Sequence, residues 1–114
     1  MPNSAENRAR LRLVGRPSGP ADQMIVVAEQ TVEVKNARGL HIRPAGMVAQ
    51  TKISFRSEVT ITHGKDVASA RSPVALKELG AGFGARLKIR AEGPDADDAL
   101  RAIAALFEGK FGEE

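Results

Sequence analysis

Strand-like and helix-like segments alternate regularly after residue 24, and their order limits the folds open to this chain. Apolar residues alternating with polar ones predict four strands, over residues 25–35, 58–62, 65–68 and 86–91. Helical spacing and capping residues predict three helices, over residues 42–54, 73–79 and 96–108. The resulting order, β-α-β-β-α-β-α, indicates an α+β domain with its helices on one face of a sheet.

The same periodicities predict which side chains form the core. In the strands we expect the inward residues to be Val32, Val34, Val59, Ile61, Leu87, Ile89 and Ala91. In the helix over residues 42–54 they are Ala45, Val48, Ala49 and Ile53. In the last helix they are Ala96, Ala99, Leu100, Ile103, Leu106 and Phe107.

Turn and capping residues mark the ends of these segments. His63 and Gly64 predict a two-residue hairpin turn in which the histidine takes a positive φ. Asp95 is expected to cap the last helix, with Asp98 three residues later in an arrangement close to a capping box. The glycine-rich loop 80–84 has the spacing of neither a P-loop nor a dinucleotide site, so we expect a flexible connection there.

Composition excludes several classes of protein. The 114 residues suggest one domain, and the hydrophobic share of 42% suffices for one core. Without cysteine the chain forms neither disulfides nor thiolate metal sites. Its two histidines show no ligand-like spacing, so we expect no metal and no cofactor. No apolar run approaches about 18 residues, which argues against a membrane span.

The small positive charge gives no reason to expect nucleic acid as a partner. The net charge is +3, and residues 1–23 hold four arginines against two acidic residues. The remaining residues are nearly neutral, with thirteen basic and twelve acidic side chains, and offer no basic face. Four phenylalanines are the only aromatic residues, which leaves few side chains on which bases could stack.

Residues 1–23 differ from the rest of the chain. They combine prolines, glycines and serines with arginines, which is typical of a disordered segment. They lack the apolar stretch of a secretory signal, and we expect a cytoplasmic protein. Met24 directly precedes the regular pattern and is an alternative start to Met1. We therefore expect a disordered extension over 1–23 and one folded domain over 24–114.

Residues 39–45 read Gly-Leu-His-Ile-Arg-Pro-Ala and suit the holding of a phosphoryl group. A neutral imidazole such as that of His41 is a nucleophile near neutral pH, since its ordinary pKa is about 6.5. Gly39 can take the positive φ of a sharp turn, and Pro44 suits the first turn of a helix. The free N–H groups of that helix start favour an anion, and Arg43 adds a cationic fork. The alternative is an ordinary surface or capping histidine.

This heptad resembles the active-site signature of the HPr family, the phosphocarriers of the bacterial phosphotransferase system that are phosphorylated on histidine. The family pattern is close to Gly-Leu-His-Ala-Arg-Pro-Ala, and Ile42 replaces the usual small residue here. The resemblance covers roughly Val27 to Phe107. It implies an open-faced β-sandwich, in which four mostly antiparallel strands are covered on one face by three helices.

The resemblance implies a carrier protein and not a turnover enzyme. His41 would accept a phosphoryl group from enzyme I and pass it to an enzyme IIA component, while Arg43 stabilises the phosphate. The carrier would be a monomer that needs no metal of its own. An alternative within the family is a regulatory member that controls carbon or nitrogen metabolism through its phosphorylation state, without sugar transport. The heptad fits both.

Two further sites are predicted beside the heptad. In the family, an HPr kinase/phosphorylase phosphorylates a serine at the start of the short helix, and Ser72 holds that place here. Pro73 follows it where the family has an aliphatic residue, and Ser69 is an alternative that fits the helix start less well. Ser72 could also be an ordinary N-cap serine. We expect Met47 to be exposed one turn from His41 and, with Val74 or Leu76, to form a docking surface for several partners.

Overall fold

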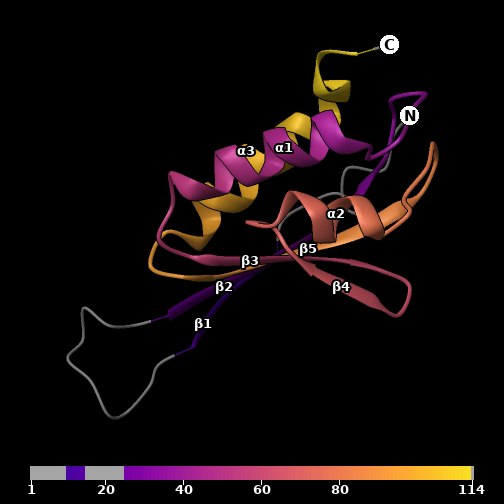
Figure 1. Ribbon diagram of the computed structural model, residues 1–114. Helices are drawn as coiled ribbons and strands as arrows, with labels where there is room; N and C mark the ends of the chain where they lie inside the picture. The colour runs from indigo at the N-terminus through magenta and orange to yellow at the C-terminus, as the bar shows by residue number, and fades with distance from the viewer. Residues whose placement is uncertain (1–9, 15–24, 114) are drawn as a thin grey trace.

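The computed structural model describes residues 10–14 and 25–113, which form one sheet with helices on one face (Figure 1). The strands are β1 (Arg10–Val14), β2 (Ile25–Glu33), β3 (Glu58–His63), β4 (Asp66–Ser69) and β5 (Arg86–Gly93). The helices are α1 (Ile42–Ile53), α2 (Pro73–Glu78), α3 (Ala96–Glu108) and the 3-10 helix η2 (Lys110–Gly112). No helix among the described residues is both long and apolar enough to cross a lipid bilayer.

The strands and helices predicted from the periodicities are present, and the α+β class is confirmed. The sheet has the order β1-β2-β5-β3-β4, and each neighbouring pair is antiparallel. β5 lies at the centre, and its register with β2 runs from Val26↔Gly93 to Glu33↔Arg86. The strands β2 to β5 with α1, α2 and α3 form the open-faced β-sandwich that the resemblance implies.

A fifth strand, β1, extends this sheet at the outer edge of β2. Its pairing runs from Arg10↔Glu29 to Val14↔Ile25. The prediction of disorder for residues 1–23 is therefore wrong for Arg10–Val14; residues 1–9 and 15–23 lie outside the described part of the chain. Composition was misleading because a short strand can join an exposed sheet edge through backbone hydrogen bonds, without a core of its own.

The hairpin between β3 and β4 turns one residue later than predicted. β3 continues through His63, which pairs with Asp66, so Gly64 and Lys65 form the turn. The positive φ, 62°, belongs to Gly64, and its assignment to His63 is wrong, because glycine adopts this conformation without a steric penalty. The Nδ1 atom of His63 lies 2.8 Å from the carbonyl oxygen of Leu79, and this contact connects β3 to the end of α2.

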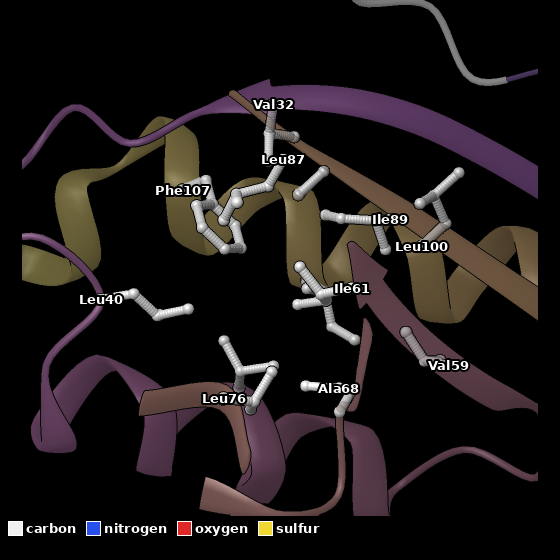
Figure 2. Packing of buried hydrophobic residues seen from close by; sticks show 14 of the residues in the cluster. Val32, Leu40, Val59, Ile61, Ala68, Leu76, Leu87, Ile89, Leu100 and Phe107 are labelled. Atoms are coloured by element: carbon white, nitrogen blue, oxygen red, sulfur yellow. The ribbon is translucent and has the colours of Figure 1, made fainter. Parts of the chain in front are cut away.

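The core lies between the sheet and the helices (Figure 2). Strand side chains that point into it include Val32, Ile61, Leu87 and Ile89, and those from the helices include Leu76, Leu100 and Phe107. The predicted inward residues of the strands are all buried. In α1, by contrast, Ile53 is 71% exposed and Lys52 is buried. Lys52 follows Ala45 by seven residues and Val48 by four, so it lies on the same buried face of α1. The methylene groups of a lysine side chain can line such an apolar surface.

The start of α3 is fastened to the loop after α1. The Asp95 carboxylate accepts hydrogen bonds from the backbone N–H groups of Arg56 and Ser57, each at 2.9 Å, and from Ser57 Oγ at 2.5 Å. It makes no side-chain capping bond to α3, so the predicted capping box with Asp98 is wrong. Burial acts to raise the pKa of Asp95, but these hydrogen bonds outweigh it and the pKa is lowered.

Candidate functional site

The heptad lies on the loop between β2 and α1, where glycine is required twice over. Gly39 has a φ of 74°, and a Cβ atom built there would lie 2.6 Å from the carbonyl oxygen of Ala81. The next residue, Leu40, donates its N–H to that same oxygen at 2.8 Å. The loop around residue 81 therefore braces the segment that leads into His41.

His41 is the N-cap residue of α1, with extended backbone, and Pro44 lies in the first turn as predicted. The histidine side chain makes no capping hydrogen bond, and the first turn of α1 contains no acidic residue. The helix start thus presents its N–H groups and its positive dipole end beside the imidazole, as an anion site requires. The side chain of His41 is 27% exposed and that of Arg43 is 66% exposed.

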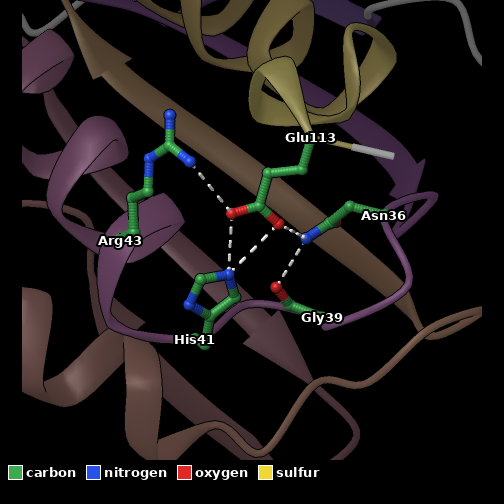
Figure 3. A network of polar contacts seen from close by, with 5 residues as sticks. All are labelled: Asn36, Gly39, His41, Arg43 and Glu113. Atoms are coloured by element: carbon green, nitrogen blue, oxygen red, sulfur yellow. Dashed lines mark hydrogen bonds and ion pairs between the residues drawn. The ribbon is translucent and has the colours of Figure 1, made fainter.

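A carboxylate from the far end of the chain completes this site, and the sequence patterns did not predict it. His41 Nε2 lies 2.8 and 3.1 Å from the two carboxylate oxygens of Glu113 (Figure 3). Arg43 Nη1 lies 3.7 Å from the nearer of these oxygens. Asn36 donates from Nδ2 to Glu113 at 3.0 Å and to the Gly39 carbonyl at 2.7 Å. The Glu113 side chain is only 10% exposed.

The C-terminal segment reaches the site through a turn with an unusual backbone. Lys110, Phe111 and Gly112 all have positive φ, at 55°, 54° and 73°. The Phe111 ring is buried edge-on against Phe107, with the ring centroids 4.8 Å apart. A phenylalanine in the left-handed region is strained, and burial of its ring offsets that cost. Phe111 is an aromatic residue beyond the last predicted helix. It is the one feature of the sequence that could have indicated an ordered tail.

The surroundings of Glu113 favour its ionised form. The hydrogen bond from Asn36 is the largest influence that lowers the pKa of this carboxyl below the ordinary value of 4.5, and burial opposes it. The hydrogen bond and charge of His41 and the charge of Arg43 lower it further. The site is therefore an imidazole held between a carboxylate, an arginine and a helix start.

The other predicted site residues fare unequally. The Oγ atom of Ser72 accepts the N–H of Ala75 at 3.2 Å, so this residue is the N-cap of α2 as expected. In the predicted docking surface Val74 is 62% exposed, but Leu76 is fully buried, and its assignment to that surface is wrong. Met47 is only partly exposed and packs against the core. In α2 the side chain of Leu76 points into the core. A helix of six residues is too short for its hydrophobic periodicity to predict which face is buried.

The exposure of two apolar side chains, one in the heptad and one in the loop 80–84, was not predicted. Ile42, directly after the histidine, is 54% exposed, and Phe83 is 69% exposed. The loop that carries Phe83 is the one whose residues 81 and 82 contact Gly39. No group of three or more potential metal-ligating residues occurs in the ranges 10–14 and 25–113.

Comparison with known proteins places this geometry in a family. The family model described as "PTS HPr component phosphorylation site" matches residues 28–109. The chain belongs to the HPr family. A phosphocarrier protein HPr from Treponema pallidum is 38% identical over 85 residues, which cover 75% of this chain and 97% of the relative. A phosphocarrier protein NPr from Shewanella violacea is 41% identical over 85 residues, which cover 75% and 93%.

Solved structures of HPr proteins share the fold. HPr-C-His from Thermoanaerobacter tengcongensis is similar to this chain with a TM-score of 0.72 and 40% identity, over 75% of this chain and 97% of the other. The HPr match over residues 28–109 agrees closely with the range of Val27 to Phe107 over which the resemblance was drawn. This chain is thus a member of a phosphocarrier family that includes HPr and NPr proteins.

Proposed function

We propose that this protein carries a phosphoryl group on His41, which it accepts from enzyme I and passes to an enzyme IIA component. The observation that carries the proposal is the imidazole at the start of α1, in a chain that belongs to the HPr family. The helix start and Arg43 supply the positive charge that a phosphohistidine needs. A phosphoramidate bond keeps a high transfer potential, so the group can move on reversibly to the next protein.

Exposed apolar residues on α1, on α2 and in the loop 80–84 form the proposed docking surface. It consists of Ile42, Val74 and Phe83, each more than half exposed, together with the partly exposed Met47. Exposed apolar side chains beside a reactive group favour contacts with protein partners. If partners dock here, Phe83→Glu will slow transfer from enzyme I, whereas Val67→Glu on the exposed strand β4 will not.

Two kinds of pathway fit such a carrier. In the first, phosphoryl transfer to enzyme IIA components serves sugar uptake. In the second, the phosphorylation state regulates carbon or nitrogen metabolism without sugar transport, and the 41% identity to an NPr protein favours keeping this alternative. Both place the protein in the cytoplasm as a monomer. Transfer assays against the enzyme IIA components of the source organism separate the two, because only a sugar-specific acceptor supports uptake.

Ser72 is a proposed regulatory site for an HPr kinase/phosphorylase. Its hydroxyl caps α2, so a phosphate there would lie at a helix start, where negative charge is tolerated. Incubation with purified HPr kinase/phosphorylase and ATP should label the wild-type protein and leave Ser72→Ala unlabelled. Equal labelling of both proteins would remove Ser72 from the proposal.

The experiment that tests the carrier function is phosphoryl transfer from phosphoenolpyruvate through purified enzyme I. Intact mass should show the gain of one acid-labile phosphoryl group, and His41→Ala should abolish it. His63→Gln provides the matched control, since His63 is the only other histidine and is bonded through Nδ1 to a backbone carbonyl. Labelling that survives His41→Ala, or that is lost with His63→Gln, would overturn the assignment.

A further inference from the structure

We propose that Glu113 is a positioning residue for phosphoryl transfer: it holds the proton of the neutral His41 ring on Nε2 and leaves the Nδ1 lone pair free to attack phosphorus. The inference rests on the proposed function of His41. It adds a second group, remote in sequence, that selects which ring nitrogen reacts.

The two distances to the imidazole decide where its proton lies. His41 Nε2 faces both oxygens of the Glu113 carboxylate, at 2.8 and 3.1 Å. An ionised carboxylate can only accept hydrogen bonds, so Nε2 must be the donor. A neutral imidazole carries a single ring proton. With that proton on Nε2, the lone pair of Nδ1 is available.

The carboxylate is fixed in place from three directions. The buried side chain of Asn36 is itself held by the Gly39 carbonyl and donates to Glu113 at 3.0 Å. The buried ring of Phe111 anchors the tail two residues earlier. Three successive residues in the left-handed region turn the chain so that Glu113 faces the ring. Backbone strain of this kind persists where the surrounding structure holds it in place, and here it presents a carboxylate to the imidazole.

The position of the proton matters because phosphoryl transfer makes the ring positive. As Nδ1 forms its bond to phosphorus, the N–P bond in the donor's phosphohistidine breaks and the electron pair returns to the donor nitrogen. The accepting ring, still protonated on Nε2, becomes an imidazolium that carries the phosphoryl group. A carboxylate on Nε2 stabilises this cation as it develops, in the way that a buried aspartate supports a catalytic histidine. No proton has to move, and the transfer can run in either direction.

Arg43 remains free for the phosphate in this arrangement. Its guanidinium is 3.7 Å from the carboxylate, longer than a direct hydrogen bond, and its side chain is 66% exposed. His41 Nε2, which is closer, therefore interacts more strongly with Glu113 than Arg43 does. The arginine can turn toward phosphate oxygens when the group arrives.

The first test measures the proton directly in the full-length protein. Long-range 1H–15N correlation spectra of the neutral His41 ring distinguish the two tautomers. We expect the wild-type ring to be protonated on Nε2 alone and the ring of Glu113→Gln or Glu113→Ala to be a mixture. Glu108→Gln is the matched control, because Glu108 pairs with Lys35 and does not contact His41. A wild-type ring protonated on Nδ1, or the same tautomer in all four proteins, would overturn the inference.

The second test separates this inference from the proposed function. Potassium phosphoramidate can phosphorylate imidazoles without a donor protein, and 31P and 15N spectra show which nitrogen is modified. We expect modification at Nδ1 in the wild type, and a rate about tenfold lower in Glu113→Gln, with part of the label on Nε2. If enzyme I fails to label the wild type, the carrier function fails, whatever the tautomer. If labelling succeeds but rate and position are unchanged in Glu113→Gln, only the role of Glu113 fails.

Discussion

His41 and Arg43 are held with different firmness. His41 is the N-cap residue of α1, and its imidazole contacts a nearly buried carboxylate. The guanidinium is mostly exposed and meets that carboxylate only at 3.7 Å. In the proposed carrier function this difference is favourable, because an exposed cation could follow phosphate oxygens on and off the ring while the ring nitrogen keeps its direction.

Replacement of Arg43 by alanine should therefore affect transfer more than stability. The loss of one exposed charge-assisted contact to phosphate is expected to lower the rate of transfer from enzyme I by about tenfold. The free energy of unfolding should change by less than about 0.5 kcal/mol, because the side chain is exposed. Quenched-flow labelling and urea unfolding measure the two quantities. An unfolding change larger than the kinetic one would point to a structural role.

The residues of the heptad were predictable because each acts through its local conformation. Gly39 turns the chain, Pro44 begins a helix, and His41 with Arg43 follow from that short stretch. Glu113 was not predictable, because it stands 72 residues from the histidine that it contacts. Only the left-handed turn before it brings it back, and no periodic pattern extends that far.

At the scale of elements, the C-terminal tail and the start of α3 show how loops fasten this domain. Strands and helices could be predicted from their periods of two and 3.6 residues. The fastening contacts could not, since they depend on which loops meet. Asp95 illustrates the difference: its place before a helix predicted a cap, yet the loop at Arg56 and Ser57 offers it three better donors.

Replacement of Asp95 by alanine should lower the free energy of unfolding by about 2 kcal/mol, because donors in the loop after α1 lose their acceptor. Asp98→Ala, on the exposed side of the same helix turn, should cost less than about 1 kcal/mol. Urea unfolding of both variants gives the comparison. Equal losses of unfolding free energy would mean that the hydrogen bonds to the loop after α1 add no stability beyond the interaction with the helix dipole.

The docking of the tail should depend on pH. The pKa of Glu113 is lowered in the folded protein, so its contacts contribute stability above the ordinary pKa of 4.5 and lose it as the pH falls through the lowered value. The difference in free energy of unfolding between wild type and Glu113→Gln should therefore be present at pH 7 and vanish in strong acid. Urea titrations from pH 7 to pH 3 measure it. A difference that persists unchanged at pH 3 would contradict the docking of an ionised carboxylate.

In the whole molecule, the N-terminal and C-terminal segments contribute to different parts of the structure. The segment before residue 24 adds β1 to the outer edge of the sheet, whereas the residues after α3 complete the candidate site. The four-stranded domain and its helices were predictable from the sequence, but the fifth strand was not, because edge pairing depends on backbone groups that every sequence has.

A chain that begins at Met24 should fold and accept a phosphoryl group, because His41 is held by Glu113, whereas β1 pairs with the outer edge of β2. We expect its free energy of unfolding to fall by about 1 kcal/mol through the loss of edge pairing. Amide exchange should quicken over residues 25–29 and stay unchanged in the hairpin of β3 and β4. Loss of phosphorylation in this shortened chain would assign the N-terminal segment a direct part in the site.

The close contact between Gly39 and the carbonyl of Ala81 bears on how such proteins are recognised in genomes. A side chain at this position would meet both a forbidden φ and a backbone oxygen, so the fold alone demands glycine. A descendant that had lost His41 but kept the fold would still carry that glycine. Gly39 of the signature therefore indicates the fold and not the activity. A sequence search for active carriers should give more weight to the positions of His41 and Arg43 than to that of Gly39.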